Sequence, residues 1–196
     1  NLSCTTCIRN VLAENLGDMS LPLFRRLLPG FGNADLINLS GFGEPLLHPE
    51  ILEMVRLAKE HSGPDTRVGF NTNATLLTEA VARKLISAGL DMLIVSIDGV
   101  QAETLKEIRI GAQLPQLLTS VEELTKTRAE LGCDTFRIGL EFVAMTDNIR
   151  ELPRLVEVAG QMGVDFVVVS NLIPYTEPMA RRILYEYNTD LAVQTM

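Results

Sequence analysis

The stretch "MLIVSIDG", residues 92–99, joins a run of apolar residues to a polar turn. Apolar residues follow one another here without alternation, which is typical of a parallel strand buried on both faces. Ser96, Asp98 and Gly99 then interrupt the apolar run. The stretch predicts a central strand of a parallel sheet, over residues 92–97, with polar groups where the strand ends.

The same combination recurs along the chain, and segments with helical periodicity separate the apolar runs. Strands are predicted at residues 36–40, 67–71, 92–97, 136–142 and 166–170. Helices are predicted at residues 20–28, 49–61, 78–88, 116–131 and 149–162. Pro49 suits a first helical turn, Thr78 suits an N-cap, and Gly89 suits a C-terminal stop. Strands that alternate with helices predict right-handed crossovers and an α/β fold, either a doubly wound sheet or a β/α barrel.

Composition narrows the class of protein. The chain has 196 residues, which is enough for about one domain. It contains three cysteines, and this odd, low number indicates a reducing compartment, so we expect a cytoplasmic protein. The net charge is −8, tryptophan is absent, and no basic run occurs, which argues against nucleic acid as a partner. No apolar run approaches the ~20 residues that a membrane span needs, so no membrane association is expected.

Polar and glycine-containing segments follow the predicted strands. They are "SGFGEP" (40–45), "NTNATL" (71–76), "SIDG" (96–99) and "SNLIPY" (170–175). The carboxyl ends of parallel strands meet at one edge of a sheet or barrel, where ligands bind. Glycine lets the backbone approach a ligand closely. Gly41 and Gly43, with the carboxylate of Glu44 beside them, therefore suit an ammonium group.

Two cysteines, Cys4 and Cys7, stand three residues apart near the start of the sequence. A C-x-x-C pair is a redox dithiol, half of a zinc site or part of an iron–sulfur ligand set. A thioredoxin-like pair should follow a strand in a smaller fold. Zinc needs four ligands, and the spacing of Cys133, His48 and His61 matches no zinc pattern. We interpret Cys133 as a small structural residue, His48 as a residue that packs against or caps the next helix, and His61 as an exposed helix end.

Glu141 is an acidic residue inside the otherwise apolar stretch "IGLEFVAM". A carboxylate in a buried strand needs a partner or a function. Two interpretations stay open: Glu141 is a functional group in a barrel interior, or a neighbouring cation satisfies it.

Taken together and in order, "NLSCTTC", "LSGFGEPLLHP", "NTNATLL" and "VSIDGV" resemble the radical S-adenosylmethionine (SAM) superfamily. The resemblance covers nearly the whole chain. It implies a partial (β/α)6 TIM-like barrel of parallel strands, with the first strand missing, and residues 1–196 as the core domain of a longer protein. It also implies two cofactors, SAM and a [4Fe–4S] cluster. Cys4 and Cys7 resemble the second and third cluster ligands, and the first is expected immediately before Asn1.

The resemblance also implies a set of SAM-binding residues. They are Ser40, Gly41, Phe42, Gly43, Glu44, Asn73, Ser96, Asp98, Arg109 and Asn171. Residues 40–44 match the motif that holds the methionyl amino group, Arg109 the arginine near the carboxylate, and Asn171 a position near adenine. Asn73, Ser96 and Asp98 correspond to positions near the ribose or the methionyl end. Two positions depart from the family pattern: Thr6 replaces an aromatic residue, and Ala74 replaces a glycine.

Within that family the chain is similar to maturases that modify a peptide, a protein or a cofactor precursor, including those associated with tungsten-dependent oxidoreductases. The resemblance implies an oxidoreductase or maturase that receives electrons from a reductant such as a flavodoxin or ferredoxin. A second, cysteine-rich domain is expected beyond residue 196, and residues 1–196 alone are expected to be inactive. The alternative is a catalytically inert β/α domain that binds a small ligand or a partner. A cysteine immediately before Asn1 would discriminate between the two.

Overall fold

The computed structural model describes residues 1–12, 17–185 and 189–195. Five parallel strands form one sheet in the order β2-β3-β4-β6-β7. The strands are β2 Leu36–Asn38, β3 Arg67–Thr72, β4 Met92–Ser96, β6 Arg137–Ala144 and β7 Phe166–Asn171. Neighbouring strands are in parallel register, so that Leu93 of β4 pairs with Phe70 of β3 and Ile138 of β6. The five strands predicted from the sequence are confirmed, with ends that differ by up to two residues.

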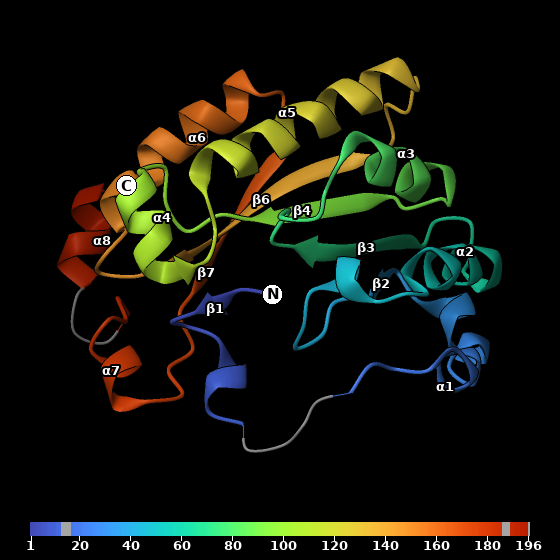
Figure 1. Ribbon diagram of the computed structural model, residues 1–196, viewed down its shortest axis with the longest axis horizontal. Coiled ribbons are helices and arrows are strands. Elements are labelled where there is room, and N and C mark those ends of the chain that lie inside the picture. Colours follow the sequence, from blue (N-terminus) through green and yellow to red (C-terminus); the bar gives the residue numbers. More distant parts are fainter. Residues whose placement is uncertain (13–16, 186–188, 196) are drawn as a thin grey trace.

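The sheet is curled into a half-barrel, which confirms the predicted α/β fold class. Figure 1 shows α5 and α6 on one side of the sheet, while β1 and the N-terminus lie on the other. The carboxyl ends of β2, β3 and β4 therefore face the N-terminal segment. Among the described residues, no helix is both long and apolar enough to cross a membrane.

The helices agree in part with those predicted. They are α1 Leu21–Arg25, α2 Ile51–His61, α3 Glu79–Ser87, α4 Ala102–Ile108, α5 Leu114–Glu130, α6 Leu152–Gln161, α7 Glu177–Ala180 and α8 Thr189–Thr195. Thr78 caps α3 as predicted, because its hydroxyl accepts a hydrogen bond from the amide of Val81. Gly89 follows α3 with φ +93°, a left-handed conformation that favours glycine. Within the described ranges the chain also forms four short 3₁₀ segments: Ile8–Asn10, Leu28–Asn33, Pro45–Leu47 and Ile149–Glu151.

Several predicted helix boundaries differ from the structure: the helix predicted from residue 149 begins at Leu152 after a 3₁₀ turn, and the helix predicted from residue 116 begins at Leu114. Two further differences have local reasons. The helix predicted from Pro49 begins at Ile51, because His48 Nδ1 accepts a hydrogen bond from the Glu50 amide and fixes a turn first. This contact places His48 beside the start of α2 but does not cap the helix, because the N-cap residue is Glu50 and no side chain caps the first turn. The helix predicted at 20–28 ends at Arg25, and the chain continues as a 3₁₀ segment that contains Pro29.

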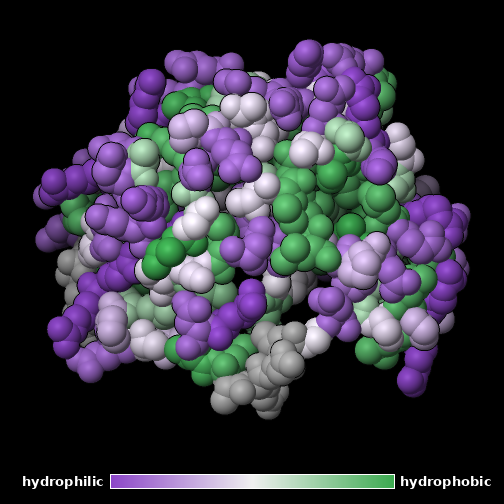
Figure 2. Space-filling model, viewed as in Figure 1, coloured by the Kyte–Doolittle hydropathy of each residue, from purple (hydrophilic) through white to green (hydrophobic). Residues whose placement is uncertain are grey.

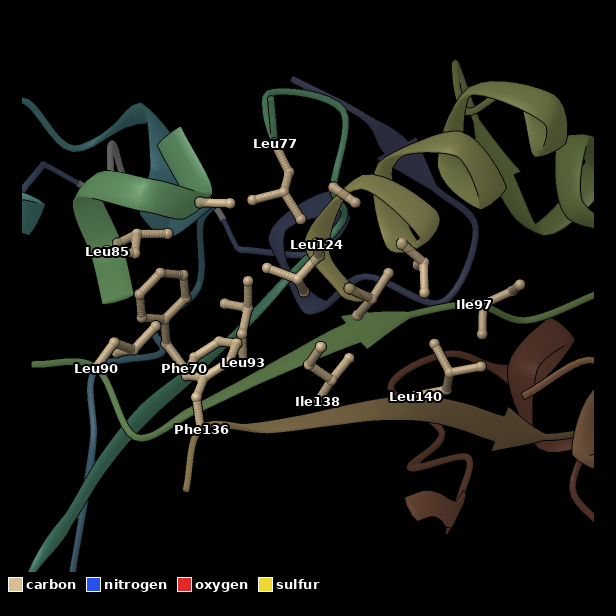
Figure 3. Close-up of a cluster of buried hydrophobic side chains, with 14 of the residues drawn as sticks. Phe70, Leu77, Leu85, Leu90, Leu93, Ile97, Leu124, Phe136, Ile138 and Leu140 are labelled. Carbon is tan, nitrogen blue, oxygen red and sulfur yellow. The ribbon is translucent and has the colours of Figure 1, made fainter. Parts of the chain in front are cut away.

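The main hydrophobic core lies between the sheet and its covering helices. Figure 3 shows apolar side chains of β3, β4 and β6 packed against α3 and α5, with Phe70, Leu93 and Ile138 facing Leu85 and Leu124. All five side chains are at most 1% exposed. These core side chains define the outer face of the sheet, which the helices cover. The alternate residues of each strand lie on the opposite, inner face.

The two edge strands do not follow the prediction of strands buried on both faces. In β7, Val168 is 38% exposed and Val169 is 48% exposed. In β2, Leu36 is 51% exposed. An edge strand has a neighbour on one side alone, so less protein covers its side chains, although its sequence is as apolar as that of a central strand.

A second, two-stranded sheet was not predicted. It pairs β1 Ser3–Cys4 with β5 Arg109–Ile110 in antiparallel register, with Cys4 opposite Arg109. The Thr5 amide extends this contact by donating to the Ile108 carbonyl at 2.8 Å. Two-residue strands carry no readable periodicity, so only the folded structure reveals this pairing.

Candidate functional site

A cavity of about 260 Å³ opens at the carboxyl end of the sheet. The cysteine segment, the loop after β2, the ends of β3 and β4, and β5 surround it. Its lining residues are Asn1, Leu2, Cys4, Cys7, Ile8, Arg9, Ser40, Gly41, Phe42, Gly43, Glu44, Asn71, Thr72, Asn73, Ser96 and Arg109. Figure 2, in the same orientation as Figure 1, shows a group of hydrophobic residues right of the centre of this face and hydrophilic residues over much of the rest. Ten of the twelve predicted site residues therefore meet in one cavity.

The cysteine loop is held in a fixed turn. The Cys7 amide donates to the Cys4 carbonyl at 3.2 Å, and the Asn10 side chain donates to the same carbonyl at 2.7 Å. Both cysteines are half-buried and unpaired, and both line the cavity. Burial raises the pKa of the Cys4 thiol, while the nearby Arg109 guanidinium acts in the opposite direction. The turn places two thiol groups on one wall of the cavity.

Glu44 ties the glycine-containing loop to the end of β3. Its Oε1 accepts hydrogen bonds from the Thr72 hydroxyl at 2.6 Å and the Leu46 amide at 3.1 Å. Its Oε2 accepts from the Asn73 amide at 2.8 Å. A Cβ atom added at Gly41 or Gly43 would meet no atom within 4 Å. The loop is therefore anchored at Glu44 and leaves open space beside its two glycines.

Asp98 and Arg109 form an ion pair behind the cavity wall. Arg109 Nε lies 2.7 Å from Asp98 Oδ2, although the two groups are not aligned as a hydrogen bond. The Asp98 side chain is 1% exposed and the Arg109 side chain 12%. Asp98 Oδ1 accepts from the Val143 amide at 2.9 Å. Arg109 lines the cavity and Asp98 does not, so Asp98 is a positioning residue for Arg109 in this arrangement.

Asn171 lies outside the cavity that the other predicted residues share. It ends β7 in register with Ala144, and it is exposed. By contrast, Asn73 and Ser96 both line the cavity. Ala74, where the family pattern has glycine, has φ +59°. The left-handed conformation costs a residue with a Cβ about 1–2 kcal/mol, which explains why glycine suits that position.

Several lining residues were not predicted from the sequence. Asn71 lies on β3, two residues before Asn73, which follows directly after the strand, and this two-residue spacing is a signal that could have identified it. Asn1 accepts a hydrogen bond from Asn73 and donates to Thr75. No sequence pattern signals contacts between residues more than 70 positions apart.

The described residues offer a partial ligand set for a metal cluster. No group of three His, Cys, Asp or Glu side chains in residues 1–12, 17–185 and 189–195 is placed to hold a metal ion. The cavity offers the two thiols of Cys4 and Cys7, which suit iron or zinc better than a hard cation. Cys133 follows α5, away from the cavity lining, as expected for a structural cysteine.

Comparisons with known proteins agree with this architecture. The sequence model of the radical SAM superfamily matches residues 1–129. The tungsten-containing aldehyde ferredoxin oxidoreductase cofactor-modifying protein of Pyrococcus furiosus is 32% identical over 97% of the chain and 54% of its own length. The AdoMet-dependent heme synthase of Methanosarcina barkeri is 31% identical over 89% of the chain and 48% of its own length. The structure of Streptococcus suis SuiB bound to S-adenosylmethionine superimposes with a TM-score of 0.67 at 16% identity, covering 99% of this chain and 42% of that one.

The fold and the cavity define a β/α half-barrel protein whose ligand site combines a C-x-x-C loop with a glycine-containing loop. The chain belongs to the radical SAM superfamily, a family of enzymes. It spans about half the length of the curated relatives it matches.

Proposed function

We propose that the whole protein cleaves S-adenosylmethionine reductively and uses the resulting radical to abstract a hydrogen atom from a cofactor precursor, peptide or protein. When bound, a [4Fe–4S] cluster supplies the one electron that splits SAM into methionine and a 5′-deoxyadenosyl radical. A reductant such as a flavodoxin or ferredoxin delivers that electron. Hydrogen transfer then gives 5′-deoxyadenosine and a substrate radical. The protein's own task is to bind, orient and shield these groups.

Cys4 and Cys7 would supply two thiolate ligands of the cluster. The described residues offer no third thiolate in the cavity, and we assign that ligand to the residue immediately before Asn1 in the natural protein. Three cysteine ligands would leave one iron of such a cluster available to bind SAM, much as a catalytic metal keeps a free position. Burial raises the pKa of the Cys4 thiol, whereas coordination to iron would favour its thiolate form.

The glycine-containing loop and Arg109 would hold the methionyl end of SAM. The space beside Gly41 and Gly43 admits the ammonium group to the loop backbone. The Arg109 guanidinium suits the methionyl carboxylate, because planar N–H donors match carboxylate geometry. Asn73 and Ser96 line the same cavity and offer hydrogen bonds to the ribose. Asn171 lies outside the cavity lining, so we make no adenine assignment to it.

The names of the relatives support an enzyme that acts on a cofactor, a cofactor precursor or a peptide. The relative from P. furiosus is named as a cofactor-modifying protein, and others are named as GTP 3′,8-cyclases. SuiB has a structure with its precursor peptide. We favour a cofactor precursor, because the relative with that description covers 97% of this chain. The meeting of both cysteines with the glycine-containing loop in one cavity is the observation that carries the proposal.

The test is anaerobic reconstitution with iron and sulfide of the chain extended by its natural flanking residues. Electron paramagnetic resonance of the reduced protein is then recorded with and without SAM. We expect a reduced-cluster signal that changes when SAM is added. Cys4→Ala and Cys7→Ala should lose most of the bound iron, whereas Cys133→Ala, the matched control, should keep it. Equal iron in all three variants would contradict the proposal and favour an inert ligand-binding domain.

A further inference from the structure

Glu141 projects from the middle of β6 on the face of the sheet opposite the main core. It pairs in register with Ser96 of β4 and Val168 of β7, and Ser96 lines the cavity. Paired residues of neighbouring strands share one face of a sheet. The Glu141 carboxylate therefore lies on the inner face of the half-barrel, next to the cavity assigned to SAM.

Neighbouring uncharged side chains hold the carboxylate on both sides. Asn71 Nδ2 donates to Oε2 at 2.5 Å, and the Ser170 hydroxyl donates to Oε1 at 3.4 Å. Asn71 is itself held in place, because its backbone N–H donates a hydrogen bond to the Ser40 hydroxyl at 2.8 Å. Contacts from β3 and β7 thus limit rotation of the carboxylate plane.

No cation neutralises Glu141 among the described residues. Its hydrogen-bond donors are Asn71 and Ser170, and it forms no ion pair in the part of the chain that the structure describes. An ionised carboxylate accepts about four hydrogen bonds, so two donors leave room for two more. Of the two interpretations from the sequence, satisfaction by a neighbouring cation is therefore wrong.

An apolar floor lies beneath the carboxylate. Gly139 is two residues earlier on the same face of β6, and a Cβ there would lie 2.3 Å from the ring of Phe166. The Phe166 ring thus takes the place that a side chain at position 139 would fill. A low-dielectric surface next to a charge strengthens its attraction for a donor. Glu141 itself stays half-buried, so a ligand can reach it.

We propose that Glu141 binds a planar substrate group that presents two parallel N–H donors, such as a guanidinium group or the amidine edge of a 2-amino heterocycle. A carboxylate fixed at both oxygens matches a planar pair of donors better than it matches a single donor. This inference rests on the proposed function, because it places the substrate beside SAM.

The test measures binding of matched probes by calorimetry, with the reconstituted protein carrying SAM. Guanosine and inosine differ by the 2-amino group, and argininamide and lysinamide differ by the planar guanidinium. We expect the probe with paired donors in one of these sets to bind at least tenfold more tightly than its partner. The set that shows the preference identifies the source as a ring or a guanidinium.

Glu141→Gln should abolish that preference and leave the affinity for SAM within about twofold. Glu157→Gln, an exposed residue of α6, makes the same change of charge and should alter neither quantity. The proposal is overturned if wild type prefers neither donor pair, if the preference survives in Glu141→Gln, or if that variant binds SAM at least tenfold more weakly. Failure of the proposed function would look different, because wild type would then not bind SAM at all.

Discussion

At the scale of single residues, Asp98 shows how a buried charge serves a neighbouring site. It is almost completely buried and holds Arg109 at the cavity wall while it anchors the Val143 amide of β6. Because Arg109 is opposite Cys4 in the β1–β5 pairing, the same carboxylate also supports the cysteine loop. A residue outside the cavity lining therefore controls the orientation of two lining residues.

Asp98→Asn should lower the free energy of unfolding by about 3–5 kcal/mol, because it leaves the buried Arg109 guanidinium without a counter-charge. Chemical denaturation measures the change. Glu157→Gln removes one partner of an exposed ion pair with Arg154 and should change stability by less than about 1 kcal/mol. Similar losses in the two variants would show that burial of the Asp98–Arg109 pair has no energetic importance.

At the scale of elements, β6 and β7 pack through a glycine that sequence patterns do not mark as special. Gly139 pairs with Phe166, whose ring covers it. Gly69 of β3 is similarly crowded by Met92 of β4: a Cβ would lie 2.8 Å from the Met92 carbonyl oxygen and 3.2 Å from its Cε. Glycine at these two positions thus leaves room for Met92 and Phe166 of the neighbouring strands.

Gly139→Ala should destabilise the protein by about 1–3 kcal/mol, because the added methyl group forces the Phe166 ring to move. The control is Gly160→Ala in α6, where a Cβ meets no atom within 4 Å. That change should stabilise the helix by about 0.5–1 kcal/mol, because alanine has the higher helix propensity. Thermal or chemical unfolding compares them, and a stable Gly139→Ala protein would exclude tight packing of β6 on β7.

At the scale of the whole molecule, a continuous sheet supports a separately attached N-terminal segment. Besides the β1–β5 pairing, hydrogen bonds hold this segment in place. Asn1 bonds to residues just after β3, and Arg182 donates to the Thr5 hydroxyl at 3.0 Å. Arg182 also pairs with Asp147, so it joins the cysteine loop to the segment after β6. Residues 177 positions apart in the sequence thus meet at the cysteine loop, beside the cavity.

Hydrogen exchange should separate these two parts of the molecule. Amides of β3, β4 and β6 should exchange slowly, because neighbours flank each strand on both sides. Amides of residues 3–10 should exchange much faster in the metal-free protein. Loading with iron, sulfide and SAM should slow amide exchange in residues 3–10 and leave the exchange rates of α6 unchanged. Protection of residues 3–10 that is as high before loading as after it would contradict a ligand-stabilised loop.

The sequence by itself determined the strands and most helices, because these features depend on local patterns. Its resemblance to a known family, together with the expected positions of the strand ends, identified ten residues of the cavity. Unbroken apolar runs favour parallel strands, and strand ends gather at one edge of the sheet, which brings together residues 40–44, Asn73 and Ser96. The C-x-x-C loop can likewise be recognised from its own residues, without knowledge of distant ones.

Only the tertiary structure decided which distant groups meet. The pairing of Cys4 with Arg109, the burial of Asp98, the exposure of Asn171 and the uncharged partners of Glu141 all depend on sheet curvature and packing. A residue's periodicity tells which face of a strand it occupies. The partner across that face comes from another strand, whose position is set by the packed core and not by the local sequence.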